Sequence, residues 1–217
     1  HAADQGDFST RQAHYLCEQA LALSVQGDRA GAKALLEQAI AAAPDAARAR
    51  IELARLQQLM GQPDAVLATL QTLGERAPAA LPLAAPLMVE AGNATGRQAE
   101  VLARLVAHYE QSPSLDVLES IVAMEAANDA TQATARARYV QHLDKERSLV
   151  AAAKWLSAEK LEHEEFHPQI QRALEHAVKP LTRYRCAACG FEARQHFWQC
   201  PGCQTWDSYP ARRVEEL

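Results

Sequence analysis

The chain has 217 residues, a net charge of −5 and no uninterrupted apolar run of 18 residues. This composition argues against a membrane span within these residues, and against a basic surface for nucleic acid or anionic lipid. Alanine is abundant while glycine and β-branched residues are few, which favours helices; the length fits one extended domain and a small one. Because the chain begins with His1 rather than methionine, we expect it to be part of a longer protein.

Helical periodicity is the first pattern along the chain. Ser9 and Gln12 are spaced as a capping box, which predicts the start of a first helix there. Its apolar positions continue to a turn at 26–28. A second helix should follow and end at Pro44, with its apolar face formed by Ala32, Leu35, Leu36, Ala39 and Ile40.

The same unit returns after 34 residues. Gly27 recurs as Gly61 and Pro44 as Pro78. The apolar positions match as well: Ala32 with Val66, Leu36 with Leu70, and Ala39 with Leu73. A third copy, shifted by one residue, is marked by Val101, Leu105, His108 and Pro113. A 34-residue period of paired helices indicates tetratricopeptide repeats, whereas a four-helix bundle would not impose this spacing of glycine and proline.

The repeat pattern is looser in the second half. It predicts helices near 114–127, 129–146, 149–165 and 168–179, with a turn at Asn128-Asp129. We interpret these helices as two degenerate repeats. The sequence therefore predicts an all-α fold, with a tetratricopeptide helical-hairpin solenoid over residues 9–179.

Four cysteines form the most specific motif. Two Cys-x-x-Cys pairs, Cys186/Cys189 and Cys200/Cys203, have ten residues between them, as in a structural zinc site. Gly190 allows a positive φ after the first pair, and Pro201 stiffens the second turn. Two disulfides are the alternative, disfavoured by the ligand-like spacing and the absence of a secretory signal. A closed four-thiolate site favours structural zinc, although iron also accepts four sulfurs.

The ribbon expected over residues 183–210 is rich in aromatic side chains. Six of the twelve aromatic residues lie there: Tyr184, Phe191, Phe197, Trp198, Trp206 and Tyr209. With the metal, this cluster should stabilise a module too small for a large core. The short linker 180–182 should make the ribbon pack against the last helices. Five arginines and four carboxylates beyond residue 180 leave little positive charge, so nucleic-acid binding is disfavoured.

Other candidate ligands have simpler interpretations. Cys17 shares a helical face with Leu16 and Ala20, as a buried small residue would. His163 and His167, together with His176, Glu162, Glu164 and Glu165, could suggest a second metal site. Pro168 should break the helix there, so a solvated charged face is favoured. The sequence contains no phosphate-binding loop, nucleophile elbow or HExxH motif, and we predict no catalytic function.

The cysteine motif resembles rubredoxin. The matching residues are Tyr184, Cys189-Gly190-Phe191, Trp198, and Cys200-Pro201 with Cys203. It departs from rubredoxin at Gln204, where glycine is usual, and in a shorter stretch between the cysteine pairs. These departures favour a zinc ribbon. A rubredoxin-type electron-transfer protein, with iron in the ribbon and the repeats as a docking surface, remains the alternative function.

The chain as a whole resembles the lipopolysaccharide assembly protein B (LapB) family, as the C-terminal part of its cytoplasmic region. The resemblance rests on Ala13-His14-Tyr15 with Cys17-Glu18, on Lys179-Pro180, and on the ribbon motif. Members carry an N-terminal membrane anchor and earlier repeats. The resemblance implies a non-catalytic adaptor on the cytoplasmic side of the bacterial inner membrane. Its implied partners are the protease FtsH, the deacetylase LpxC, whose degradation it promotes, and other envelope-assembly proteins.

Overall fold

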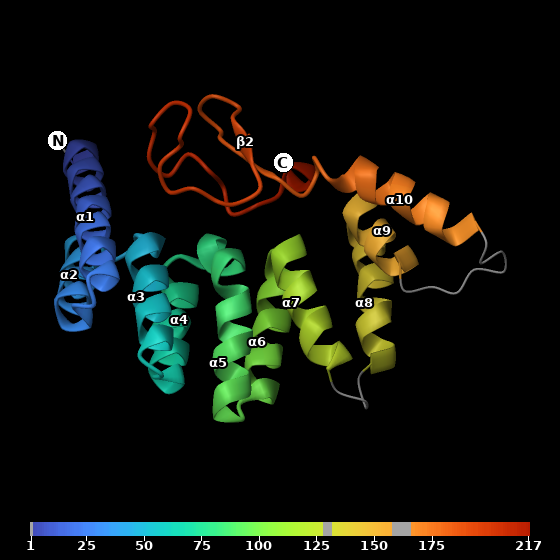
Figure 1. Cartoon of the computed structure of the whole chain (residues 1–217), viewed down its shortest axis with the longest axis horizontal. Helices are drawn as coiled ribbons and strands as arrows, with labels where there is room; N and C mark the ends of the chain where they lie inside the picture. The colour runs from blue at the N-terminus through green and yellow to red at the C-terminus, as the bar shows by residue number, and fades with distance from the viewer. Residues whose placement is uncertain (1, 128–131, 158–165) are drawn as a thin grey trace. The chain divides into compact units, whose positions relative to one another are not determined.

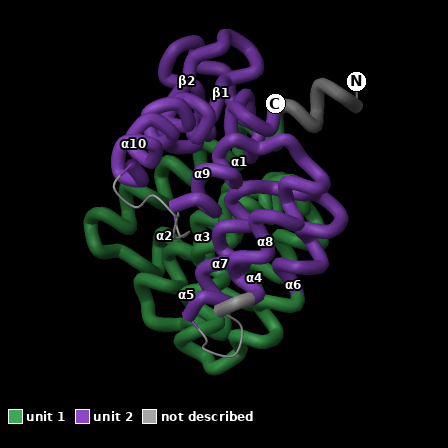
Figure 2. Tube along the Cα trace, turned by 90° about the vertical axis from the view of Figure 1, so that its right-hand side faces the viewer, with its two compact units in different colours: residues 1–103 green, residues 104–217 purple. Residues whose placement is uncertain are grey.

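The computed structural model describes residues 2–127, 132–157 and 166–217, and it confirms the all-α fold with a small ribbon. The chain forms two compact units, residues 1–103 and 104–217 (Figure 2). The helices of the first unit are α1 (Ala2–Val25), α2 (Arg29–Ala42), α3 (Ala47–Leu59), α4 (Pro63–Arg76), the 3₁₀ helix η1 (Pro78–Ala84) and α5 (Ala85–Thr95). Helix α6 (Gln98–Gln111) crosses the boundary between the units.

In the first unit, consecutive helices pack as hairpins in chain order, α1 against α2 and α3 against α4 (Figure 1). The hairpin turns contain Gly27, Gly61 and Gly96, whose φ angles are +91°, +69° and +71°. Only glycine adopts this left-handed conformation without a steric penalty, so the repeated glycine is a requirement of the turn. Gly96 lies one residue later than a strict 34-residue period would place it, as the shifted third copy predicts.

Most of the predicted core positions are buried, whereas Leu35 and Ile40 of α2 are partly buried. Ala32, Leu36 and Ala39 of α2 and their counterparts Val66, Leu70 and Leu73 of α4 are each 2 % exposed or less. In the third copy Val101 and Leu105 are also buried, but His108 is only half-buried. Tyr109, one helical turn after Leu105, is buried instead.

Arg48 on α3 connects the first two hairpins through residues of the family-like segment of α1. Its Nη2 atom donates to Glu18 Oε1 at 2.5 Å, and its Nη1 atom lies 3.5 Å from His14 Nδ1. The Arg48 side chain is almost completely buried, whereas Glu18 is half exposed. The buried guanidinium charge is therefore neutralised by a carboxylate that is itself partly exposed to solvent.

One local prediction for the first unit needs correction. Helix α1 begins at Ala2 rather than at Ser9, because no proline precedes Ser9 to stop the helix. The side-chain cap occurs in α2 instead, where Asp28 Oδ1 accepts the Gly31 amide at 2.8 Å. The stretch after Pro78 forms η1 before α5 begins, since Pro82 cannot donate to a continuous α-helical ladder.

The second unit holds the remaining elements. They are α7 (Leu115–Ala126), α8 (Gln132–Lys145), α9 (Leu149–Ser157), α10 (His167–Val178), β1 (Tyr184–Arg185), β2 (Glu192–Ala193) and the 3₁₀ helix η3 (Val214–Glu216). Helices α7 to α10 pack in chain order, close to the predicted bounds. The predicted turn at Asn128-Asp129 and the predicted helical stretch 158–165 lie outside the described residues. Within the described residues, no helix has both the length and the apolarity needed to cross a bilayer.

Candidate metal centre

The ribbon consists of two short hairpins that each present one cysteine pair. Strands β1 and β2 pair antiparallel, with Tyr184 opposite Ala193 and Arg185 opposite Glu192. The Arg185 guanidinium donates to Glu192 Oε1 across this pair at 2.9–3.0 Å. In the second hairpin a single bridge joins Gln199 to Trp206. Each hairpin thus holds its cysteine turn between two paired chain segments.

The two cysteine turns have the same hydrogen bonds. In the first turn, the Cys186 amide donates to Phe191 O at 2.9 Å, and the Gly190 amide donates to Cys186 O at 2.9 Å. The second turn repeats both bonds fourteen positions later: Cys200 N to Thr205 O at 2.9 Å, and Gln204 N to Cys200 O at 2.8 Å. The two turns are therefore equivalent knuckles, related by a local pseudo-symmetry around the cysteine cluster.

The residue after each cysteine pair has the same backbone conformation. Gly190 has a φ of +79°, as predicted, and Gln204 has a φ of +60°. Gln204 was the position where the sequence departs from rubredoxin. The structure shows that this departure preserves the turn, because Gln204 adopts the left-handed conformation that glycine usually provides.

The four sulfurs lie at distances that suit a tetrahedral metal site. Cys186 Sγ is 3.8 Å from Cys203 Sγ, and Cys189 Sγ is 3.7 Å from Cys200 Sγ. All four Sγ atoms lie within 4.8 Å of one another. Zn–S bonds of about 2.3 Å in a tetrahedron place the sulfurs about 3.8 Å apart. The cluster is therefore a potential metal site, and its donor set fits zinc or iron.

Three hydroxyl groups lie close to the cysteine sulfurs. The sequence did not predict these contacts. Ser208 Oγ lies 3.2 Å from Cys186 Sγ, and Thr205 Oγ1 lies 3.3 Å from Cys203 Sγ. Tyr209 OH lies 4.0 Å from Cys200 Sγ and donates to Phe191 O at 3.0 Å. These groups can orient and stabilise thiolates. No spacing rule identifies them, because hydroxyls are common and only the folded turn brings them to the sulfurs.

The local environment shifts the pKa values of the cysteine thiols in different directions. Burial opposes ionisation of Cys186, but hydrogen bonds from Ser208 and the knuckle backbone lower its pKa to about 6. The side chain and amide of Thr205 likewise lower the pKa of Cys203. The Phe191 amide favours the Cys189 thiolate, yet burial and the neighbouring thiols raise its pKa to about 12. Four thiolates so close together therefore need a cation to ionise together.

The aromatic cluster of the ribbon is centred on a histidine. The His196 ring makes edge contacts with Tyr184, Trp198 and Tyr209, at centroid distances of 5.7, 4.8 and 6.0 Å. Its Nε2 atom donates to Tyr209 O at 2.9 Å. Phe191 differs from our expectation, since it is 44 % exposed and lies over the other knuckle. A Cβ atom at Gly202 would lie 3.2 Å from its ring.

The remaining sequence candidates lie elsewhere. Cys17 is fully buried in α1 between Ala13 and Ala20, and burial raises its pKa to about 12, as expected for a packing residue. His167 Nε2 donates to Leu156 O at 3.3 Å, and His176 is exposed. His163 and the glutamates 162, 164 and 165 lie outside the described residues.

Comparisons with known proteins give matches to both the helical repeats and the ribbon. A family model described as a rubredoxin metal binding domain matches residues 184–209, and a tetratricopeptide repeat model matches residues 26–91. Lipopolysaccharide assembly protein B of Escherichia coli strain K12 is 42 % identical over 41 residues, which is 18 % of this chain and 10 % of that protein. The proteins of that name from strains O6:H1 and O157:H7 match equally well.

The chain matches only about a tenth of the length of these curated relatives. The local similarity nevertheless agrees with the two family matches and with the cysteine geometry. Together they show a chain with tetratricopeptide repeats and a rubredoxin-type metal-binding ribbon, with local similarity to lipopolysaccharide assembly protein B.

Proposed function

We propose that this protein is a non-catalytic adaptor in lipopolysaccharide assembly. The observation that carries the proposal is the combination of tetratricopeptide repeats with a closed four-cysteine ribbon in one chain. Stacked helical hairpins present extended surfaces for protein partners. A metal with four protein ligands has no open position for substrate or water, so a structural role suits it better than a catalytic one.

We further propose that Cys186, Cys189, Cys200 and Cys203 together bind one zinc ion. The sulfur separations and the hydroxyls around the cluster support this assignment. Bound zinc supplies no redox chemistry; it links the two knuckles and so stabilises a module with a small core. The ribbon residues then keep the aromatic cluster around His196 assembled on one side of the site.

The resemblance to the lipopolysaccharide assembly protein B family suggests specific partners. The adaptor acts on the cytoplasmic side of the inner membrane and brings LpxC to the protease FtsH. Degradation of LpxC then limits lipid A synthesis. Confinement of adaptor and protease to one membrane raises their effective concentration, which can increase avidity about 10²–10⁴-fold.

A pull-down with purified partners tests the adaptor role. FtsH and LpxC are incubated with the intact chain, with Cys186→Ser/Cys189→Ser, and with the matched control Cys17→Ser. We expect the intact chain and the control to retain both partners, and the ribbon variant to retain less. Retention of neither partner by the intact chain, even when tethered to vesicles, would contradict the proposal.

Electron transfer is the second candidate, because Cys189 and Cys203 are exposed and would bring a bound iron close to solvent. Visible absorption separates the candidates. A ferric tetrathiolate absorbs strongly in the visible, whereas zinc is colourless. We expect protein purified without added metal to be colourless and to contain zinc; a red protein with stoichiometric iron would favour the electron-transfer role.

A further inference from the structure

The last five residues of the chain, 213–217, return to the helices of the second unit. We name this segment the C-terminal clasp. It runs beside the linker that precedes the ribbon, since Val214 N donates to Arg183 O at 2.7 Å and Glu215 N donates to Leu181 O at 3.2 Å. Arg213 Nη1 donates to Thr182 O at 2.6 Å. The chain segments that enter and leave the ribbon are therefore fastened to each other.

Glu215 of the clasp caps the N-terminus of α9. Its carboxylate accepts hydrogen bonds from Ser148 Oγ at 2.6 Å, from Leu149 N at 2.5 Å and from Val150 N at 3.1 Å. Ser148 Oγ in turn accepts the Ala151 amide at 2.9 Å. The amides of the first helical turn have no partner within the helix, and a carboxylate there also interacts favourably with the helix dipole.

Glu216 occupies the corresponding place on α7. Its Oε1 atom accepts the Leu115 amide at 2.8 Å, and its Oε2 atom accepts the Arg213 amide at 2.6 Å. Ser114 is the N-cap residue of α7 but makes no capping bond with its side chain. Among the residues that the structure describes, its buried hydroxyl has no hydrogen-bond partner. The start of α7 thus takes its cap from a residue about a hundred positions away in sequence.

Asp116 in the first turn of α7 completes the attachment. Its Oδ1 atom accepts from Arg213 Nε at 3.0 Å and from Nη2 at 2.5 Å, while its Oδ2 atom accepts from Tyr184 OH at 2.8 Å. The Arg213 guanidinium also lies 4.4 Å above the Tyr184 ring. Because Tyr184 belongs to β1, this group links the ribbon itself to the helix.

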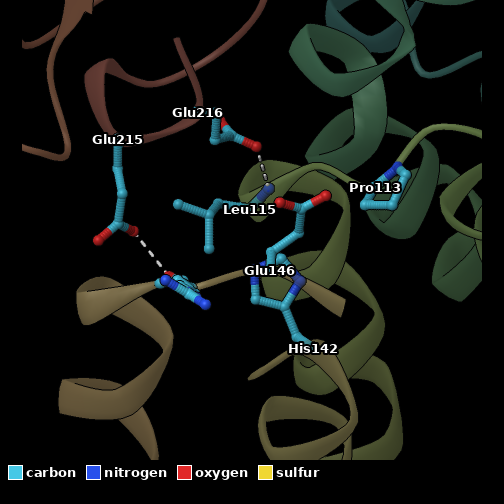
Figure 3. A pocket seen from close by; sticks show the side chains of 8 residues that line it. Pro113, Leu115, His142, Glu146, Glu215 and Glu216 are labelled. Carbon is cyan, nitrogen blue, oxygen red and sulfur yellow. Dashed lines mark hydrogen bonds between the residues drawn. The ribbon is translucent and has the colours of Figure 1, made fainter. Parts of the chain in front are cut away.

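A small cavity separates the two capped helix ends (Figure 3). It is lined by Leu115 of α7, Ser148 before α9, His142 of α8 and both clasp glutamates. Figure 3 shows Glu215 and Glu216 reaching the helices from the same side, with the bond of Glu216 to Leu115 drawn as a dashed line. The two helix starts therefore receive two consecutive carboxylates from one extended segment.

We propose that the N-termini of α7 and α9 form a docking site for an acidic peptide segment, and that the chain's own residues 213–217 occupy it. The site recognises two consecutive carboxylates and a preceding arginine. Its occupation fixes the ribbon on the helices through bonds that are separate from those of the metal site. Release of the clasp uncaps both helices and loosens the ribbon, which then stays attached through its linker and through the hydrogen bond of Tyr184 to Asp116.

The test uses the double variant Glu215→Gln/Glu216→Gln in the full chain, loaded with zinc. Amide exchange is followed by NMR at Leu115, Leu149 and Val150. We expect roughly tenfold faster exchange at these amides, the ratio that loss of a charged hydrogen bond implies. Nitrogen relaxation should show the ribbon more mobile relative to α7 and α9 than in the unchanged protein. The Gly31 amide, capped by Asp28, is an internal reference that should not change.

Two control variants show whether the effect is specific to the clasp glutamates. Glu192→Gln removes a carboxylate that pairs with arginines of the ribbon and its linker, so it should leave the three amides protected. Glu215→Asp keeps the charge but shortens the side chain, and should expose Leu149 and Val150 while Leu115 stays protected. Zinc content should be one per chain throughout. A double variant with wild-type exchange and wild-type ribbon mobility would overturn the proposal, as would ribbon loosening that occurs only when zinc is lost.

An added peptide tests the docking site directly. A synthetic hexapeptide with the sequence of residues 212–217 should restore slow exchange at Leu115 and Leu149 in the double variant. The same peptide with glutamine at both glutamate positions should not. Equal effects of the two peptides, or no effect of either, would show that the helix ends do not recognise carboxylates.

Discussion

Gly190 and Gln204 occupy equivalent positions in the two cysteine knuckles, and both have a left-handed backbone conformation, with φ of +79° and +60°. The amide of each donates to the carbonyl of the first cysteine of its knuckle. A Cβ atom at Gly190 would meet nothing within 4 Å. The two positions therefore differ in backbone strain rather than in side-chain packing.

This equivalence predicts opposite effects for a pair of substitutions. Left-handed backbone costs a non-glycine residue about 1–2 kcal/mol. Gln204→Gly should raise the free energy of unfolding by about 0.5–1 kcal/mol, because the greater freedom of glycine in the unfolded chain offsets part of the gain. Gly190→Ala should lower it by about 0.5–1 kcal/mol, because the smaller freedom of alanine in the unfolded chain offsets part of the strain. Denaturant unfolding of the zinc-bound proteins measures both; effects of the same sign would contradict the assignment.

The proposed zinc site predicts that metal content depends on the four ribbon cysteines and not on Cys17. Cys186→Ser removes one of the four clustered sulfurs and should abolish stoichiometric zinc binding. Cys17→Ser changes a cysteine buried in the helical core and should keep one zinc per chain, although a buried hydroxyl there lowers stability. Elemental analysis after gel filtration gives the ratio. Zinc loss in the Cys17 variant of a folded protein would show that the site is assigned incorrectly.

The repeat core predicts a contrast between two leucines of neighbouring helices. Leu70 on α4 is fully buried, whereas Leu59 at the end of α3 is 66 % exposed. Leu70→Ala should lower the free energy of unfolding by about 2–5 kcal/mol, because it leaves a cavity between packed helices. Leu59→Ala should change it by less than about 0.5 kcal/mol. Urea titration monitored by circular dichroism measures both values.

His142 should make stability depend on pH. Burial lowers its pKa below 6.5, and Lys145 acts in the same direction, while Glu146 and Glu215 oppose them. A lowered histidine pKa means that the unfolded state binds more protons, so stability falls as pH drops below about 6.5. His142→Asn should reduce this slope between pH 7.5 and pH 6. Urea midpoints of the zinc-bound proteins at several pH values provide the test.

His108 and Glu216 also contribute to the pH dependence of stability, and their contributions must be separated from that of His142. Burial also lowers the pKa of His108, so part of the slope should survive in the His142 variant. Burial raises the pKa of Glu216 above 4.5, and this shift contributes to the pH dependence of stability with the opposite sign. An unchanged slope in His142→Asn would assign the pH dependence to other groups.

The sequence predicted the parts of the structure that depend on periodicity and spacing. Buried Val66, Leu70 and Leu73 follow from a repeat that must place apolar residues on one helical face. The cysteine cluster follows because two short turns can bring four sulfurs together without any knowledge of the remaining fold.

The attachments between distant segments could not be predicted in the same way. The bond of Glu216 to Leu115 and that of Arg213 to Asp116 depend on where the ribbon returns the chain. Carboxylates near a C-terminus are compatible with many partners, and nothing in their spacing selects a helix end. His196 was missed for a similar reason, since its place among Tyr184, Trp198 and Tyr209 arises only when both hairpins have formed.

The half-life of LpxC in living cells tests the adaptor role most directly. Cells that lack their native adaptor would express this chain fused to an inner-membrane anchor, either unchanged or with Cys186→Ser/Cys189→Ser. We predict that the unchanged protein shortens the half-life of LpxC in an FtsH-dependent manner, and that the cysteine variant, present at an equal level, does so much less. An LpxC half-life that the unchanged, anchored protein leaves unaltered would contradict the account.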